Sequence, residues 1–368
     1  MLFKKSTEYY TLNNILKYNA KYNVIYGERS NGKTYSVYNY ALERFCKYGE
    51  QFAIIRRWQD DFTGKRGQTM FNAIINDDLV KKYSDGEWTG IYYYSSQWFL
   101  CRYETDGKRI SSEIPFAYGF AITTQEHDKS TAYPNVKTIL FDEFLTRTGG
   151  YVRDEFVLFC NTLSTIIRDR DDVTIFMCGN TVNRFCPYFS EMGLNRVLEM
   201  KHGDIDVYKY GDSGLTVAVE YAPPTKRNGK KGKPSDVYFA FDNPKLRMIT
   251  GGEWELAIYP HCPEKYRPCD ILYTYFIKFD GRILQCEIVR GEHGYFTFIH
   301  EKTTPIKNQY TDLVFDSLAN SPNRNIRRSI KNAEDRLGEK IWYFFKNYRV
   351  FYQSNDIGDL VANYLASV

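Results

Sequence analysis

The feature that most constrains the fold is an eight-residue segment, Gly27-Glu28-Arg29-Ser30-Asn31-Gly32-Lys33-Thr34. It matches the phosphate-binding pattern GxxxxGK[ST] at every fixed position. An apolar stretch (24–26) precedes it, and a segment with helical character (35–45) follows it. Such a loop turns backbone N–H groups inward, and the helix behind it adds about half a unit of positive charge. The sequence therefore predicts a strand, loop and helix that bind a nucleoside triphosphate.

Two side chains of this loop have specific expected roles. Lys33 is expected to reach the β- and γ-phosphates, and the hydroxyl of Thr34 to complete the shell of a Mg²⁺ ion. ATP and Mg²⁺ are thus the expected cofactors. The alternative is a glycine-rich turn that binds nothing.

A second acidic motif follows an apolar strand expected over 136–144. Asp142 and Glu143 stand near the end of this strand, as in a Walker B element. Asp142 would hold Mg²⁺ through its water shell, and Glu143 would polarise the attacking water. An acidic pair in a surface turn is the alternative interpretation.

The arrangement of strands favours a motor ATPase over a small-molecule kinase. An apolar strand at 51–57 intervenes between the phosphate-loop strand and the strand before Asp142, and the acid is doubled. The strand at 173–178 would deliver Asn180 to the γ-phosphate or the attacking water. A turn-capping asparagine is the other interpretation of this residue.

Two arginines close the helix expected at 153–167. Arg168 or Arg170 could reach a neighbouring subunit's nucleotide in a ring and neutralise transition-state charge. Either could equally be a cation favoured at a helix C-terminus.

Composition limits the remaining classes. The net charge of the 368 residues is only +4, so any contact with nucleic acid must be local. The eight cysteines form no CxxC pair, which argues against zinc and disulfides and favours reduced thiols. There is no 18-residue apolar run. We expect a soluble, intracellular protein with no membrane partner.

The chain is expected to form two domains. Residues 1–205 are expected to form the α/β motor domain, 206–240 a basic linker and 241–368 a smaller α+β domain. The linker contains a glycine-punctuated basic run that either contacts a phosphate backbone or is merely solvated. Its members are Lys226, Arg227, Lys230, Lys231 and Lys233.

The C-terminal domain is expected to contain a hairpin and two helices. The hairpin joins 271–279 to 282–289 across Asp280-Gly281. The first helix would place Ile326 and Phe345 on one apolar face, and the second would cover 357–365. A basic face on the first helix could grip DNA or another partner; it comprises Arg324, Arg327, Arg328 and Lys331.

Three blocks of sequence resemble the DNA-packaging (encapsidation) ATPases of small phi29-type tailed phages. They are Lys47-Tyr48-Gly49-Glu50-Gln51-Phe52 running to Arg56-Arg57, Lys129-Ser130 with Ala132-Tyr133-Pro134-Asn135-Val136 through Asp142-Glu143-Phe144, and Pro187-Tyr188-Phe189. The resemblance spans about residues 20–190, and it is faint beyond 205.

The resemblance implies a fold and a function. The fold is a P-loop NTPase of the ASCE type, a mostly parallel sheet sandwiched by helices, followed by a decayed RNase H-like nuclease domain. The function is a ring motor, typically a pentamer, that docks in the host cytoplasm at the portal vertex of an empty procapsid. ATP hydrolysis would drive double-stranded DNA inward, in some cases with a packaging RNA. The resemblance implies Arg168 as the trans-acting finger and Lys129 as a second basic residue near the neighbour's nucleotide.

Two other classes remain open. A helicase or DNA-translocating ATPase outside packaging would separate strands or carry a membrane anchor. A nucleotide kinase or regulatory NTP-binding module would turn over as a monomer, or only bind, without stimulation by DNA.

Overall fold

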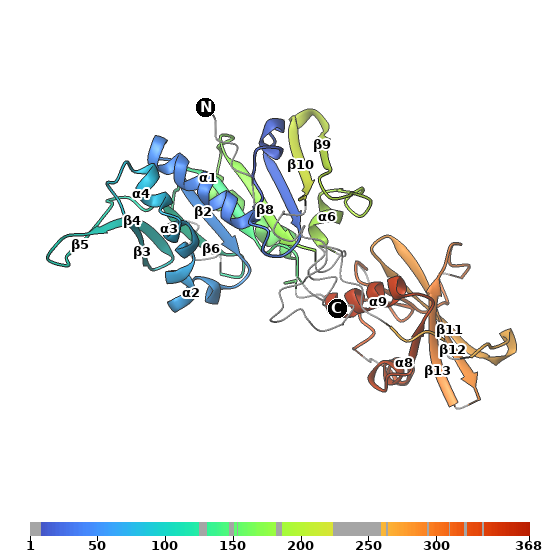
Figure 1. The fold of residues 1–368 in the computed structure, drawn as a ribbon. Helices are drawn as coiled ribbons and strands as arrows, with labels where there is room; N and C mark the ends of the chain where they lie inside the picture. The colour runs from blue at the N-terminus through green and yellow to red at the C-terminus, as the bar shows by residue number, and fades with distance from the viewer. Residues whose placement is uncertain are drawn as a thin grey trace, which may run out of the picture. The chain divides into compact units, whose positions relative to one another are not determined.

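The computed structural model describes residues 9–124, 131–146, 151–152, 154–181, 186–223, 259–262, 264–292, 294–308, 310–319, 322–332 and 335–368. The described residues of 9–146 and 154–223 belong to one compact unit, and those of 259–368 belong to a second. Each unit is built on its own β-sheet (Figure 1).

The first unit has a ten-stranded, mostly parallel sheet in the order β3-β4-β6-β2-β7-β8-β1-β10-β9, with β5 paired to β4. The six strands from β6 to β10 in this order run parallel, whereas β3, β4, β5 and β9 pair antiparallel. The strand bounds are β1 (Tyr22–Gly27), β2 (Gln51–Arg56), β3 (Gly90–Tyr94), β4 (Gln97–Tyr103), β5 (Arg109–Ser111), β6 (Ala117–Ala121), β7 (Val136–Asp142), β8 (Thr174–Asn180), β9 (Ile205–Tyr210) and β10 (Leu215–Tyr221).

The central strands are nearly continuous runs of buried residues, as expected for parallel strands covered on both faces. Neighbouring residues of β7 show the two faces. Leu140 belongs to the cluster that includes Val37 and Leu42 of α1 (Lys33–Tyr48), whereas the ring of Phe141 stacks on Phe159 of α5 (Glu155–Ile167). Helices therefore cover both faces of this sheet, and Figure 1 shows α1 lying across one of them.

The loop-to-helix transition occurs where the sequence predicts it. Gly32, with φ of +95°, is the N-cap of α1, and Gly49, with φ of +70°, ends the helix by donating its N–H to the carbonyl of Phe45. Glycine adopts such left-handed backbone angles without a steric penalty. The remaining helical segments of this unit are η1 (Ile15–Tyr18), η2 (Gln59–Phe62), α2 (Gly64–Thr69), α3 (Asn72–Asn76), α4 (Leu79–Tyr83), α6 (Pro187–Glu191) and η4 (Gly211–Ser213).

Two predictions about the order of strands and domains need correction. In the sheet, the strand between β1 and β7 is β8, and β2 lies on the other side of β7. The first domain also does not end at 205, because β9 and β10 continue its sheet to Tyr221. Strand β10 pairs in parallel with β1 through a buried run, 217–221, and β9 pairs antiparallel with β10.

The second unit has a six-stranded sheet in the order β15-β14-β11-β12-β13-β16. Strands β11, β12 and β13 form an antiparallel meander, and β14, β15 and β16 add in parallel. The bounds are η5 (Pro268–Asp270), β11 (Ile271–Phe279), β12 (Arg282–Gly291), β13 (Gly294–Glu301), β14 (Val314–Asp316), β15 (Ile326–Arg327), α8 (Arg336–Lys346), β16 (Val350–Tyr352) and α9 (Asn355–Ser367). The predicted hairpin and second helix are confirmed.

The first predicted C-terminal helix is wrong over its first turns. Residues 326–327 form strand β15, which pairs with β14, and the helix begins only at Arg336. Asp335 caps it by accepting a hydrogen bond from the N–H of Gly338. Within the described ranges, no helix has both the length and the apolar character needed to span a membrane.

Candidate nucleotide-binding site

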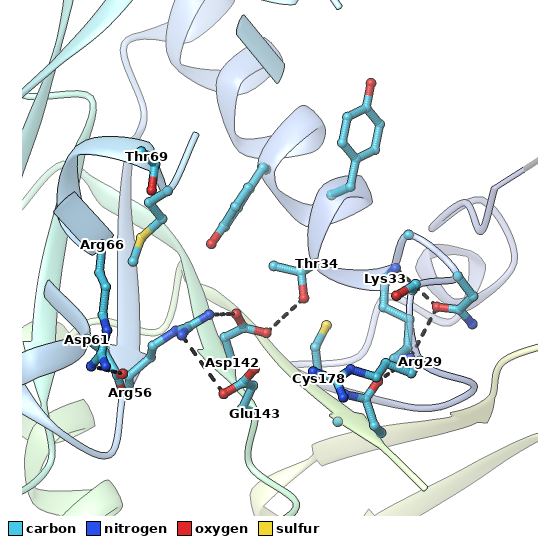
Figure 2. A pocket seen from close by; sticks show the side chains of 18 residues that line it. Arg29, Lys33, Thr34, Arg56, Asp61, Arg66, Thr69, Asp142, Glu143 and Cys178 are labelled. Atoms are coloured by element: carbon cyan, nitrogen blue, oxygen red, sulfur yellow. Dashed lines mark hydrogen bonds and ion pairs between the residues drawn. The ribbon is translucent and has the colours of Figure 1, made fainter. Parts of the chain in front are cut away.

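A pocket of about 560 Å³ opens where the phosphate loop meets the C-terminal ends of β2, β7 and β8 (Figure 2). The phosphate loop, the acidic end of β7 and the end of β8 contribute to it, together with part of the 59–70 segment. Its lining residues are Arg29, Ser30, Asn31, Gly32, Lys33, Thr34, Tyr35, Tyr38, Arg56, Asp61, Arg66, Thr69, Met70, Asp142, Glu143, Cys178, Gly179 and Asn180.

Lys33 is buried at the base of this pocket. Its ammonium group donates to the carbonyl of Glu28 at 2.6 Å and to the side-chain oxygens of Asn31 at 3.1 Å and Asn180 at 3.3 Å. Burial lowers the pKa of Lys33 to about 8, although the carboxylates of Asp142 and Glu28 partly oppose this shift. Lys33 and Asn180, which were predicted to approach the same phosphate, therefore touch one another.

The two motifs meet through a direct hydrogen bond. The hydroxyl of Thr34 donates to Oδ1 of Asp142 at 2.8 Å, so the two predicted Mg²⁺ ligands are adjacent. The other oxygen of Asp142 accepts from Arg56 Nη2 at 2.5 Å, and Arg56 Nη1 lies 3.9 Å from Glu143 (Figure 2). Burial alone would lower the pKa of Arg56, but Asp142 and Glu143 hold it above its ordinary value.

Two buried donors in the pocket wall lack partners among the described residues. They are Nδ2 of Asn31, whose residue is fully buried, and Nε of Arg56. A buried donor without an acceptor costs free energy unless a ligand supplies one. Together with the loop's backbone N–H groups, these donors fit the anionic phosphates of a nucleotide.

Glu143 has an unusual backbone conformation. Its φ is +60°, in the left-handed region that residues with a Cβ seldom adopt, while its side chain is 64% exposed and lines the pocket. Strained backbone of this kind is concentrated at functional sites.

Nine of the described lining residues were not singled out from the sequence as nucleotide contacts, among them Arg56, Asp61, Arg66 and Tyr38. Arg66 lies on α2 and pairs with Asp61 at 3.8 Å across the pocket mouth from the phosphate loop. Arg56 could have been found from the sequence by its position at the C-terminal end of a buried strand. That position points to the acidic pair only once β2 is known to pair with β7.

The two arginines after α5 have different environments. Arg168, with φ of +52°, is exposed and donates to the carbonyl of Thr131 at 3.0 Å. Arg170 donates to the carbonyls of Tyr133, Pro134 and Val136 and to those of two residues in the last turn of α5. Neither arginine appears among the described lining residues of the pocket.

The remaining predicted sites are only partly described. Lys129 and the basic run Lys226, Arg227, Lys230, Lys231 and Lys233 lie outside the described residues. The basic face predicted at 324–331 is not a helix face. Arg327 is buried against Asp335 at 2.7 Å, and Lys331 donates to the carbonyl of Val368.

No group of three or more histidine, cysteine, aspartate or glutamate residues that could hold a metal ion occurs in the described part of the chain. Thr34 and Asp142 remain the residues that could hold Mg²⁺ beside a nucleotide, since hydroxyl and carboxylate oxygens suit this ion.

Comparison with known sequences identifies relatives of this chain. The chain is 30% identical to the DNA packaging protein of Bacillus phage phi29 over 183 residues, which cover 49% of each protein. It is also 30% identical to the DNA packaging protein of Bacillus phage B103 over 182 residues, which cover 49% of this chain and 50% of that one. The chain thus spans about half the length of the curated relatives it matches.

Two solved structures share the fold over nearly the whole chain. One is the Phi-28 gp11 DNA packaging motor, with a TM-score of 0.55 at 18% identity and 98% coverage of both chains. The other is the bacteriophage Phi-29 viral genome packaging motor assembly, with a TM-score of 0.55 at 20% identity, covering 96% of this chain and 97% of that one.

The family model described as podovirus DNA encapsidation protein (Gp16) matches residues 3–209, which is more than half of the chain and includes the whole pocket. The chain therefore belongs to the podovirus DNA encapsidation protein family.

Proposed function

We propose that this protein is an ATP-hydrolysing motor that moves double-stranded viral DNA into an empty procapsid. The observation that carries the proposal is the hydrogen bond between Thr34 and Asp142, which joins the phosphate loop to the acidic strand end with Glu143 beside it. Family membership supports the packaging role.

The proposed chemistry assigns a task to each group in the pocket. The backbone of residues 27–34 and the ammonium of Lys33 bind the phosphates of ATP. Mg²⁺, held by Thr34 and Asp142, would neutralise charge on the phosphates. Glu143 orients the attacking water and accepts its proton, and Asn180 contacts the γ-phosphate or that water.

The strand order supports an ASCE-type P-loop ATPase. Strand β8, which ends at Asn180, lies between β1 and β7, so a polar side chain stands between the phosphate loop and the acidic pair. Enzymes that only transfer phosphate to a bound substrate do not need the second acid, Glu143.

We further propose that Arg168, rather than Arg170, acts in trans on a neighbour's nucleotide in a ring of copies, with Lys129 nearby. Arg170 is engaged by five carbonyl groups, whereas Arg168 is exposed and outside its own pocket. An arginine supplied by a neighbour can raise the rate by about 10³-fold or more. The ring is expected to be a pentamer that acts in the host cytoplasm at the portal vertex, in some systems with a packaging RNA.

The second unit is proposed to be a decayed RNase H-like domain that contacts DNA, portal or RNA. Its meander β11-β12-β13 is extended by parallel strands β14 and β15 beside β11, an order typical of that class. Glu287 on β12 accepts hydrogen bonds from Tyr266 and Gln285, both at 2.6 Å, so this carboxylate is engaged within the protein. The basic run 226–233 is proposed as a second contact to DNA phosphates.

Steady-state ATPase activity with and without long double-stranded DNA, at low and moderate salt, tests the proposal. We expect strong stimulation that fades as salt rises, because contacts to phosphates release counterions. Turnover that DNA does not change, even with empty procapsids added, would indicate the kinase or regulatory class. Stimulation accompanied by strand separation would indicate a helicase.

A further inference from the structure

A buried ion pair lies directly behind the acidic strand end. Arg57, the residue after β2, is 6% exposed, and its guanidinium donates hydrogen bonds to both carboxylate oxygens of Glu155. Nε lies 2.8 Å from Oε2 and Nη2 lies 2.7 Å from Oε1. The hydroxyl of Tyr188 donates to Oε1 at 2.9 Å. Strand β2 and helices α5 and α6 therefore meet at one polar cluster, which we call the Arg57 cluster (Arg57, Glu155 and Tyr188).

The same guanidinium also holds the backbone that carries Glu143. Nη1 of Arg57 donates to the carbonyl of Glu143 at 2.9 Å, and Nη2 donates to that of Phe144 at 2.8 Å. The N–H of Phe144 donates to the carbonyl of Cys178 on β8. Peptide groups on the C-terminal side of Glu143 are thus tied to two neighbouring strands.

This arrangement bears on the direction of the Glu143 side chain. The side chain is mostly exposed, and its ion-pair contact among the described residues is to Arg56 at 3.9 Å, so these contacts fix it weakly. Its left-handed φ of +60° determines where the Cα–Cβ bond points. A residue with a Cβ persists in this region only where the surrounding structure enforces it. The hydrogen bonds of Arg57 hold the carbonyls of this residue and the next one.

A role confined to stability explains the Arg57 cluster less well. A buried ion pair contributes little net stability, because desolvation offsets much of the attraction. Arg56 and Arg57 are also neighbours at one strand end that contact different parts of the same dipeptide. Arg56 binds the carboxylate of Asp142, and Arg57 binds the carbonyl of Glu143.

We propose that Arg57, oriented by Glu155 and Tyr188, is a positioning residue that aims Glu143 at the attacking water by holding its backbone. The inference rests on the proposed role of Glu143 in hydrolysis. It predicts that loosening the Arg57 cluster slows the chemical reaction and leaves nucleotide binding unchanged, since none of its three side chains lines the pocket described above.

The test compares Arg57→Lys with Arg44→Lys in the full chain. Lysine keeps the charge but cannot form the fork of hydrogen bonds. Arg44 makes a similar two-bond pair with Glu50, remote from the acidic strand end, and is the matched control. We expect Arg57→Lys to lower kcat by about 10- to 100-fold, as small misplacements do. KM and the Kd of a non-hydrolysable ATP analogue should stay within about threefold of wild type, and Arg44→Lys should behave as wild type.

A folded Arg57→Lys protein with wild-type kcat would overturn the inference, as would a fall in kcat matched by an equal loss of nucleotide affinity. If Arg57→Lys does not fold, Tyr188→Phe provides the test, because it removes one hydroxyl and should lower kcat by about threefold or more.

Hydrogen exchange of peptide 141–146 gives a readout without turnover. It should accelerate in Arg57→Lys and not in Arg44→Lys. Absence of ATPase activity in the wild type would reject the proposed function, while unchanged exchange would reject the positioning role.

Discussion

At the scale of single residues, the pocket keeps a charged lysine in a place that disfavours charge. Lys33 has its pKa lowered from 10.5 to about 8 by burial, and in the absence of phosphate its partners are neutral oxygens of Glu28, Asn31 and Asn180. A triphosphate would supply the missing negative charge. The site is thus built for a bound ligand at some cost to the free protein.

This cost predicts a pH dependence of stability. Between pH 8 and 10 the unfolded chain binds more protons at Lys33 than the folded chain does. The free energy of unfolding therefore rises with pH in this range, by about 1 kcal/mol per pH unit from this group. Urea unfolding of wild type and Lys33→Met at several pH values measures it. We expect the free energy of unfolding of wild type, relative to that of Lys33→Met, to increase as the pH rises above 8. A difference that does not change with pH would contradict the lowered pKa.

Glu143 allows a separation of binding from turnover. Replacement by glutamine keeps the shape and removes the negative charge that is proposed to activate water. We expect Glu143→Gln to bind ATP with wild-type affinity and to lose at least about 100-fold in kcat. Equilibrium binding and steady-state hydrolysis test the two halves of the prediction. Near-normal hydrolysis would remove Glu143 from the mechanism.

At the scale of elements, Arg170 joins the end of α5 to the segment that enters β7. It donates to carbonyls of residues 133, 134 and 136 and to those of 166 and 167. We expect Arg170→Ala to lower the free energy of unfolding by about 2 kcal/mol, the usual effect of leaving partly buried carbonyls without a charged donor. Arg168→Ala, the matched control, should lower it by less, because the Arg168 side chain is exposed. Equal effects in urea unfolding would contradict the separate roles.

The sequence predicted the elements that rest on local patterns. The phosphate loop, the strand before Asp142 and the hairpin across Asp280-Gly281 depend on glycine positions and apolar runs that lie within a few residues of one another. It also brought Lys33, Thr34, Asp142 and Asn180 to one site, because strand ends of a parallel sheet share an edge.

What the sequence did not predict depends on long-range pairing. Arg57 reaches Glu155 and the carbonyl of Glu143 only because β2 lies beside β7, and no local pattern encodes that neighbour. At Ile326 a local pattern predicted the wrong element. Its spacing fits a helix, but hydrogen bonds from the N–H groups of 325 and 326 to Asn323 form a turn, and pairing with Val314 makes a strand.

At the scale of the whole molecule, the proposed ring requires that each active site draw on two subunits. Glu143→Gln and Arg168→Ala should each be inactive alone. Mixed in equal amounts, they should regain DNA-stimulated ATPase activity, since roughly a quarter of the sites in a ring then combine an intact glutamate with a neighbour's arginine. ATPase assays across mixing ratios measure this. A mixture as inactive as its components would contradict an arginine supplied in trans.

Helix α5 has a mechanical consequence in such a ring. Its first residue, Glu155, binds Arg57, which donates to the carbonyl of Glu143, and the residue after its last turn is Arg168. Thirteen helical residues form a stiff rod about 20 Å long. Under the proposed function, a tilt of this helix as a rigid body moves both of its ends at the same time. One displacement of α5 would then change both the geometry of hydrolysis in its own subunit and the distance from Arg168 to the neighbouring subunit's nucleotide.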